Sequence, residues 1–469
     1  MINQAVLLPT TSKSRPFCSA ISRCDLSSHG YREEEYLLSG TSNRYITGEN
    51  SLPQETGEVL SYTTRMIIRQ PEKVQKSHVV IEIINSTAGF DIERVWADSW
   101  RYFVRHGITY VGITSKPNVF SALQRYDFSR YQALSWPRLD PENGPADSFW
   151  GPLDQEFGAA WDIFLEAPDY LRSAESPLHI KPVCIFLAGW SQSCSYINRL
   201  LNSFIYPGKS IRGKVYDGYF AAGGVHKLSI PLCMAEREKE LPAAERRVDF
   251  CPVPLVEINT ESENSDFGGF QGYTARRADS DVPGFLYRYL EIPGSCHDAA
   301  DSARDYTRFD TDVEQALGHP LTGFDLVPHP NRYPKRFGFH LAWRNLIAWA
   351  STGISPMHQP RIEKDGLGNN RTDFAGNAVG GLRTPLLELP TARYCSWNDH
   401  LPGGRNYLMG HEESFSPAWL LETYGSLDAY MKRAAESTDL CIARGMLLEE
   451  DRQDMLDTAA AFAKTNGLE

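Results

Sequence analysis

Apolar and polar residues alternate regularly along the middle of the chain. Val79–Ile84, Ile108–Ile113 and Val183–Ala188 are runs of mostly apolar residues, which is typical of strands buried on both faces of a sheet. Between the first two runs, residues 92–106 carry large apolar side chains at helical spacing. Further strands are expected at Val215–Ala221, Pro254–Asn259 and Leu286–Ile292. This alternation predicts the α/β class, with a mostly parallel central sheet flanked by helices.

The same pattern predicts how the chain is organised. Residues 1–30 are rich in serine and lack periodicity, so we expect an irregular tail there. The alternation continues over residues 31–320, which we interpret as one α/β domain, and it stops in residues 321–469, which we interpret as a C-terminal extension packed on that domain. The aromatic segment 115–178 and the charged segment 226–250 are candidates for inserted cap segments over the active site.

Composition and charge narrow the class of protein. Of the 469 residues, 42% are apolar and 23% are charged, which is typical of a globular protein rather than a disordered or fibrous one. The formal net charge of −12 argues against nucleic acid or an anionic membrane as the main partner. No run of about 18 apolar residues occurs, so we expect no membrane span. The first residues lack the features of a signal peptide, which favours a cytoplasmic location.

The cysteines and histidines show no spacing that indicates a metal site. The nine cysteines are an odd number without framework spacing, and we interpret them as thiols in a reducing compartment. No Cys-x-x-Cys, His-x-x-His or His-Glu-x-x-His segment occurs, and no glycine-rich stretch follows a strand as a phosphate loop does. We therefore predict no metal and no cofactor. The oligomeric state is not predicted.

The strongest chemical signal is the segment Gly189-Trp190-Ser191-Gln192-Ser193, which follows a predicted strand and precedes an amphipathic helix. A G-x-S-x-G segment in this position is typical of a nucleophile elbow, in which the serine lies on a tight turn between strand and helix. Small residues two positions before and after the serine let the backbone cross closely, and Ser193 in place of the last glycine is still small. The other interpretation is a plain Gly-Ser turn, because the motif alone recurs by chance.

Residues after the next two predicted strands support a catalytic triad. Hydrolases with this elbow use a serine, then an acid, then a histidine, each after its own strand. Here Glu261 and Glu263 follow one strand, with Asp266 further along, and His297 follows the next. We favour Glu263 as the acid, and Glu261 is the alternative. The loop before the histidine also contains Cys296, and a disulfide between it and Cys194 is the alternative to two thiols.

Each residue of this triad has a distinct chemical role. Ser191 is a weak nucleophile until His297 takes its proton, and the carboxylate holds the imidazole in the required tautomer. The developing oxyanion needs two N–H donors. One is the backbone N–H of Gln192, at the start of the predicted helix. The second comes from the loop after the strand that ends at residue 84, where we favour Ser86, with Thr87 next.

Several segments together resemble the α/β-hydrolase domain-containing family with a G-x-S-x-S elbow. They are Val80–Ser86, Tyr110–Thr114, Gly189–Ser193, Val215–Gly218, Asn259–Glu261, Gly294–His297 and Gly376–Pro385. The last segment is the most specific to the family. The resemblance implies an α/β-hydrolase fold and a Ser–acid–His triad, and it does not fix a substrate. Gly376–Pro385 is either a loop bordering the active site or a set of glycine-dependent turns that dock the C-terminal extension, and we favour the turns.

These observations predict a serine hydrolase that cleaves a carboxylic ester, lactone or related acyl bond of a small molecule through an acyl-enzyme. The alternatives are an acyltransferase or product-releasing (thio)esterase of a biosynthetic pathway, and a non-catalytic ligand-binding protein of the same fold. Trp190 and Asn85 are candidate substrate-pocket residues, because they flank the predicted nucleophile and oxyanion loop. The aromatic residues of segment 115–178 either line a pocket or pack the core of an insertion, and we favour core packing.

Overall fold

The computed structural model divides the chain into two compact units. Unit one comprises Met1–Leu255, Asp281–Leu286 and Phe309–Leu321, and unit two comprises Val256–Ser280, Tyr287–Arg308 and Thr322–Glu469. The residues that the structure describes are 1–19, 24–48, 51–138, 147–148, 151–152, 155–211, 213–226, 228–264, 276–298, 311–320, 327, 329–398 and 408–469. These units divide the chain at other positions than the predicted boundary at residue 320, and the domain assignment stays a prediction.

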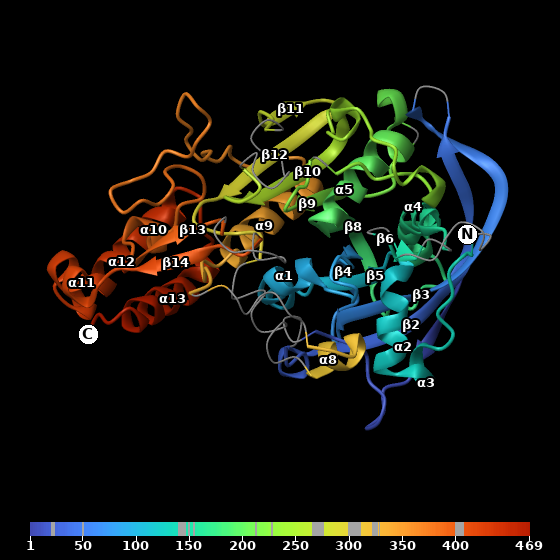
Figure 1. Cartoon of the computed structure of the whole chain (residues 1–469), viewed down its shortest axis with the longest axis horizontal. Helices are drawn as coiled ribbons and strands as arrows, with labels where there is room; N and C mark the ends of the chain where they lie inside the picture. Colours follow the sequence, from blue (N-terminus) through green and yellow to red (C-terminus); the bar gives the residue numbers. More distant parts are fainter. Residues whose placement is uncertain are drawn as a thin grey trace. The chain divides into compact units, whose positions relative to one another are not determined.

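Ten strands form the main sheet in the order β1-β2-β3-β5-β4-β8-β9-β10-β12-β11 (Figure 1). Their bounds are β1 (Ile2–Leu8), β2 (Tyr31–Thr47), β3 (Pro53–Pro71), β4 (Lys76–Ile84), β5 (Thr109–Thr114), β8 (Lys181–Trp190), β9 (Gly218–Ala222), β10 (Cys251–Thr260), β11 (Ser280–Val282) and β12 (Phe285–Ile292). β4 pairs in parallel with β5 and β8, and β8 pairs in parallel with β9. β1, β2, β3 and β5 pair antiparallel. The predicted α/β class and the α/β-hydrolase fold are confirmed.

The central strand β4 shows why the apolar runs form this sheet. Val79, Val80 and Ile81 are completely buried, as expected for a strand covered on both faces. Glu82 is the polar exception, and its carboxylate accepts hydrogen bonds from the Val95 backbone N–H at 2.9 Å and from the Tyr110 hydroxyl at 2.9 Å. Burial raises the pKa of Glu82 to about 8, although these donors act in the opposite direction. The carboxylate therefore secures the start of α1 to the sheet.

The N-terminal part of unit one differs from the prediction. The expectation of an irregular tail over residues 1–30 is wrong for Ile2–Leu8, which pair as β1 with β2. From the sequence, the segment Tyr31–Arg69 predicts only short strands, such as Met66–Ile68, whereas β2 and β3 are 17 and 19 residues long and pair along most of their length. Their faces carry many polar residues, so apolar periodicity did not reveal them.

Helices of unit one occupy the segments between the strands. They are α1 (Arg94–Arg105), α2 (Phe120–Tyr126), α3 (Phe128–Tyr131), α4 (Ala160–Arg172), α5 (Gln192–Arg199) and α8 (Thr311–Leu317). In the aromatic segment, Phe120, Tyr131, Trp136 and Trp161 are buried and Phe128 is exposed. Core packing therefore accounts for most of the described aromatic residues there. Among the described residues, no helix combines the length and apolar character needed to cross a membrane.

Unit two adds a helical region and a short hairpin. Its helices are α9 (Arg336–Thr352), α10 (Pro385–Glu388), α11 (Pro417–Tyr424), α12 (Leu427–Ala443) and α13 (Arg452–Thr465), and the hairpin consists of β13 (Ala392–Cys395) and β14 (His411–Ser414). In the Gly376–Pro385 segment, Gly380 has φ of +81°, and a Cβ there would lie 2.1 Å from the Arg361 carbonyl oxygen. Asn377 donates to the Ala392 carbonyl at 3.1 Å. This segment therefore forms glycine-dependent turns that hold β13.

Candidate active site

Ser191 lies on a strained turn between β8 and α5. Its backbone has φ of 60° and ψ of −119°, a conformation that costs a non-glycine residue about 1–3 kcal/mol. The Ser191 N–H donates to the Ala222 carbonyl on β9 at 2.9 Å, and the Ser191 carbonyl accepts from the Cys194 N–H at 3.0 Å. The neighbouring strand and the first turn of the helix thus hold the turn. The serine is 9% exposed.

Two glycines make this turn possible. A Cβ on Gly189 would lie 2.7 Å from the backbone of Ser193, so no other residue fits there without moving the helix. Gly223 has φ of +60°, and a Cβ there would lie 2.8 Å from the Trp190 ring. The first glycine of the motif is therefore required by the close crossing of strand and helix. The fifth position accommodates a serine side chain.

Trp190 and Asn85, the two candidate pocket residues, are both buried in unit one. The Trp190 ring is 1% exposed, and the Arg94 guanidinium lies 5.4 Å from its centroid. The Asn85 amide donates to the Trp190 carbonyl at 3.1 Å, and its oxygen accepts from the Thr87 N–H at 3.0 Å. Asn85 therefore ties the loop after β4 to the end of β8. A pocket role for either side chain stays a prediction.

The predicted oxyanion donors differ in their hydrogen bonding. The Thr87 N–H is committed to Asn85, as described above. Among the described residues, the backbone N–H groups of Ser86 and Gln192 have no acceptor. Ser86 is completely buried, and its carbonyl accepts from the Asn118 amide at 2.8 Å. This geometry favours Ser86 over Thr87 as the donor from this loop.

Lys116 is a residue next to the elbow that sequence reasoning missed. Its side chain is buried, its Nζ donates to the Gln192 side-chain oxygen, and it lies 5.7 Å from the centroid of the Tyr196 ring. Burial lowers the pKa of Lys116 to about 7. The sequence did contain a signal for Lys116. This lysine follows the carboxyl end of β5, and functional side chains collect at the carboxyl ends of strands in open parallel sheets.

In unit two, Glu263 and His297 form a buried carboxylate–imidazole pair. Glu263 Oε1 lies 2.6 Å from His297 Nδ1, and both side chains are buried. The other carboxylate oxygen accepts from the Thr260 hydroxyl at 2.7 Å and from the Thr260 N–H at 2.5 Å. Burial alone would raise the pKa of Glu263, but the charge and hydrogen bond of His297, together with the Thr260 donors, hold it below its ordinary value.

The loop that carries His297 is held by several hydrogen bonds. The His297 N–H donates to the Ser262 hydroxyl at 3.0 Å, and Ser262 donates to the Ser396 carbonyl at 2.9 Å. The Lys335 ammonium donates to the His297 carbonyl at 3.1 Å. These contacts fix the backbone on both sides of the imidazole, so the orientation of the ring does not depend on Glu263 alone.

Glu261, the alternative acid, has different partners. Its carboxylate accepts from the Gly294 N–H at 2.7 Å and from the Asn370 amide at 2.8 Å. Burial raises the pKa of Glu261 above its ordinary value, against the effect of these donors. Of the two predicted acids, the structure therefore brings Glu263 to the histidine, while Glu261 braces the turn after β12. Asp266 lies outside the described residues.

The predicted site residues belong to both units. Ser191, Gln192 and the Ser86 loop lie in unit one, and Glu263 and His297 lie in unit two. Cys194 and Cys296 are both buried thiols, and no disulfide joins any of the nine cysteines.

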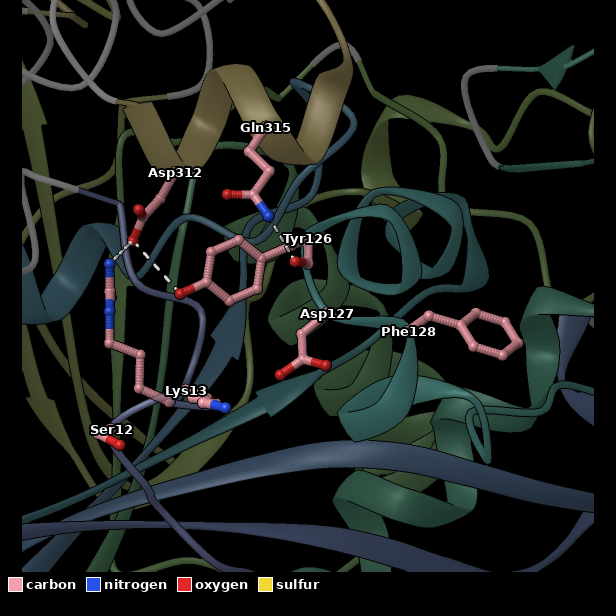
Figure 2. Close-up of a pocket in the computed structure, with 8 residues that line it drawn as sticks. Ser12, Lys13, Tyr126, Asp127, Phe128, Asp312 and Gln315 are labelled. Atoms are coloured by element: carbon pink, nitrogen blue, oxygen red, sulfur yellow. Dashed lines mark hydrogen bonds and ion pairs between the residues drawn. The ribbon is translucent and has the colours of Figure 1, made fainter.

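A separate cavity of about 450 Å³ lies in unit one (Figure 2). Its lining is polar, and Arg15 forms an ion pair with Asp312 at 2.6 Å beside the Tyr126 ring. Gln315 donates to the Tyr126 carbonyl at 2.8 Å. None of the predicted site residues lines this cavity. The Arg15 and Asp312 side chains pair with each other, and the Asp127 carboxylate accepts from the Ser14 and Ser129 hydroxyls.

Comparison with known proteins places these features in a family. The model described as "Alpha/beta hydrolase domain" matches residues 4–457. No curated protein matches the chain. Among solved structures, an esterase of Pyrobaculum calidifontis is 12% identical, covers 54% of this chain and 75% of its own, and has a TM-score of 0.30.

Two further solved structures show similarly low likeness. Esterase Est22 is 14% identical over 59% of this chain and 76% of its own, with a TM-score of 0.31. An alpha-beta serine hydrolase homologue from Coxiella burnetii is 10% identical over 54% of this chain and 88% of its own, with a TM-score of 0.27. The assignment therefore rests on the family model, which covers nearly the whole chain. The chain belongs to the alpha/beta hydrolase domain family.

Proposed function

We propose that this chain is a serine hydrolase that cleaves a carboxylic ester or lactone through an acyl-enzyme on Ser191. The observation that carries the proposal is the buried pair of Glu263 and His297, with its 2.6 Å contact at Nδ1. A carboxylate at Nδ1 fixes the tautomer in which Nε2 carries a lone pair, as a general base requires. Membership of the alpha/beta hydrolase domain family supports the same reaction class.

In the proposed reaction His297 Nε2 takes the proton of the Ser191 hydroxyl as its oxygen attacks the acyl carbon. The resulting imidazolium is stabilised by the Glu263 carboxylate, which does not itself take the proton. The imidazolium then protonates the leaving alkoxide, and the acyl group remains on Ser191. Water, deprotonated by the same imidazole, attacks the acyl-enzyme. The imidazolium then returns this proton to the Ser191 oxygen as the carboxylic acid leaves.

The oxyanion formed on the acyl carbon needs donors that are already in place. We assign this role to the backbone N–H groups of Gln192 and Ser86. In comparable enzymes the removal of one such donor costs about 3–4 kcal/mol of transition-state stabilisation. The strained Ser191 turn supports this assignment, because it places the Gln192 N–H at the first position of α5. Helix N-terminal N–H groups of this kind are not used within the helix.

A fluorophosphonate probe tests the proposal, because it labels only an activated serine. We expect the purified full-length chain to be labelled at Ser191, as mapped by mass spectrometry, and Ser191→Ala and His297→Ala to abolish labelling. Ser193→Ala is the matched control, since it removes a hydroxyl two residues away, and it should label normally. Absence of labelling in a folded chain, or labelling that persists in Ser191→Ala, would overturn the proposal.

The fate of the acyl group separates hydrolysis from transfer. The chain would be incubated with a panel of p-nitrophenyl esters and lactones, with and without an added alcohol. We expect release of the free acid and no acyl transfer to the alcohol. A dominant transfer product would instead assign the chain to the acyltransferases, with Ser191 in the same role.

A further inference from the structure

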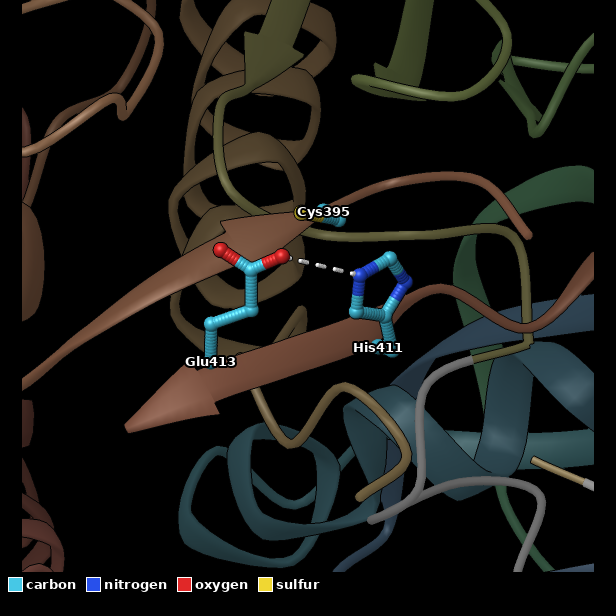
Figure 3. A group of neighbouring side chains, drawn as sticks. All are labelled: Cys395, His411 and Glu413. Carbon is cyan, nitrogen blue, oxygen red and sulfur yellow. Dashed lines mark ion pairs between the residues drawn. The ribbon is translucent and has the colours of Figure 1, made fainter. Parts of the chain in front are cut away.

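A cluster of three potential metal ligands lies on the β13–β14 hairpin of unit two (Figure 3). The two strands pair antiparallel, so that Cys395 lies opposite His411, and Arg393 lies opposite Glu413. Glu413 is two residues from His411 and therefore lies on the same face of the hairpin. One ligand atom from each of Cys395, His411 and Glu413 lies within 4.8 Å of the others.

The hydrogen bond of His411 leaves the correct nitrogen for a metal. His411 Nδ1 lies 3.2 Å from the carbonyl oxygen of Trp397, which accepts hydrogen bonds and cannot donate them. Nδ1 therefore carries the proton, and in the neutral ring Nε2 presents a lone pair. Histidine ligands of metals typically donate their other N–H to a carbonyl or carboxylate in this way.

The Glu413 carboxylate also presents an oxygen that can bind a metal. Nε2 of His411 lies 3.5 Å from Glu413 Oε1, while the other oxygen of this carboxylate lies 3.2 Å from the Arg393 guanidinium. An imidazole, a carboxylate and a thiol sulfur thus face one another. Figure 3 shows the imidazole and the carboxylate turned toward each other and joined by this contact. A divalent cation bound between them takes the place of the proton that such an ion pair needs on Nε2.

We propose that Cys395, His411 and Glu413 bind a divalent transition metal of the zinc class, with water completing the coordination. Sulfur, imidazole and carboxylate ligands together select zinc or a similar metal over magnesium or calcium. Tetrahedral zinc with bonds of about 2.0–2.3 Å places its ligand atoms about 3.3–3.6 Å apart, so the three side chains need to move only slightly. Binding converts the Cys395 thiol to a metal thiolate and releases its proton to water.

Hydrogen bonds connect this hairpin to the loop of His297. The Asn331 amide donates both to the Cys395 carbonyl at 3.1 Å and to the Gly294 carbonyl at 2.8 Å. The Ser396 carbonyl accepts from Ser262, which holds the His297 N–H. A metal that links β13 to β14 stiffens the hairpin on which this loop rests. Its role is thus structural, and no bond to substrate is implied.

Cobalt titration tests the proposal directly. The full-length chain is stripped with a chelator, kept anaerobic and titrated with Co²⁺, because a thiolate ligand gives a near-ultraviolet charge-transfer band. We expect one equivalent to bind with this band, and Zn²⁺ to displace it. Cys395→Ser should lose the band. Cys441→Ser, which removes another thiol of unit two, is the matched control and should retain it.

Two further variants keep the test independent of the cysteine. His411→Gln and Glu413→Gln should each weaken Zn²⁺ binding at least about tenfold in competition with a chromophoric chelator. They should also lose the rise in Tm that Zn²⁺ gives the unsubstituted chain. Circular dichroism establishes that each variant is folded. Binding that survives all three substitutions, or the absence of a stoichiometric cobalt complex in the unsubstituted chain, would overturn the proposal.

Discussion

The Ser191 turn and the Glu263–His297 pair are built in opposite ways. Backbone geometry holds the serine: its φ is 60°, its N–H bonds to the Ala222 carbonyl, and Gly189 must lack a Cβ. Side chains hold the pair, through a 2.6 Å contact between two ionisable groups and the donors from Thr260. The turn should therefore be sensitive to added volume, and the pair should be sensitive to changes of charge.

The largest expected effect is a loss of charge at the pair. Glu263→Gln keeps the size of the side chain but removes its charge, and its amide can hold the imidazole in the wrong tautomer. If the triad operates as proposed, kcat should fall about 1,000- to 10,000-fold. Steady-state hydrolysis of an activated ester measures this effect.

Glu261→Gln is the matched control for this charge change. The amide oxygen still accepts from the Gly294 N–H, although the amide nitrogen no longer accepts from Asn370. Because Glu261 does not bond to His297, kcat should change only slightly. Equal losses in the two variants would contradict the assignment of Glu263 as the acid and would point to a general effect of charge in this region.

The second effect comes from volume at the turn. Gly189→Ala places a methyl group 2.7 Å from the Ser193 backbone, so β8 and α5 must separate. We expect a loss of about 2–4 kcal/mol in the free energy of unfolding, as for other overpacked or strained sites, together with loss of fluorophosphonate labelling. Urea unfolding followed by circular dichroism measures the first.

Gly366→Ala shows whether this effect comes from the close crossing. A Cβ on Gly366 meets no atom within 4 Å, and its φ is not positive. This variant should unfold at the same urea concentration as the unsubstituted chain. If both alanine variants were equally stable, the close crossing at the elbow would not be needed for folding.

The sequence predicted those parts of the fold whose physics is local. Buried strands such as β4 are apolar on both faces, and a serine between a buried strand and an amphipathic helix predicts the elbow without knowledge of its partners. The sequence did not predict β1, and it predicted only short strands where β2 and β3 lie. An antiparallel strand with many polar residues gains its stability from pairing with its neighbours, which apolar periodicity does not reveal.

What the sequence could not predict at the candidate sites also depends on contacts between segments that are distant along the chain. The expected order of serine, acid and histidine predicts an acid after β10, and both Glu261 and Glu263 lie there. Their hydrogen bonds in the structure distinguish the two. Cys395 and His411 are 16 positions apart, which matches no short metal motif, and cross-strand pairing alone makes them neighbours. Sequence spacing predicts sites built on one turn, whereas sites built across strands depend on register.

The third prediction concerns the pH dependence of stability, which differs between the Ser191 turn and the Glu263–His297 pair. The pKa of Lys116 falls from 10.5 to about 7 on burial, so between these values the unfolded chain binds more protons than the folded chain. The contribution of Lys116 to the free energy of unfolding therefore rises with pH between about pH 7 and pH 10.5, and it is lowest below pH 7. The lowered pKa of Glu263 acts at another pH: its contribution is present above about pH 4.5 and is lost as the pH falls further.

Lys116→Met removes the titration next to the elbow. The stabilisation of the variant relative to the unsubstituted chain should be about 1–3 kcal/mol larger at pH 6 than at pH 9. Urea titrations at the two pH values measure the difference. Lys432→Met, at an exposed position, is the control and should show no such dependence. A gain of the same size at both pH values would attribute the effect to apolar packing rather than to charge.

The smallest effect concerns the fifth position of the elbow, where Ser193 replaces glycine. Ser193→Gly adds no volume and removes no charge, and the turn depends on Gly189 rather than on this residue. We expect a loss of up to about 1 kcal/mol in stability, because glycine disfavours the helix α5, and an unchanged kcat/KM. Urea unfolding and ester hydrolysis measure the two quantities. A fall in kcat/KM of tenfold or more would mean that the Ser193 hydroxyl takes part in the reaction, and the turn could then no longer be described by its backbone alone.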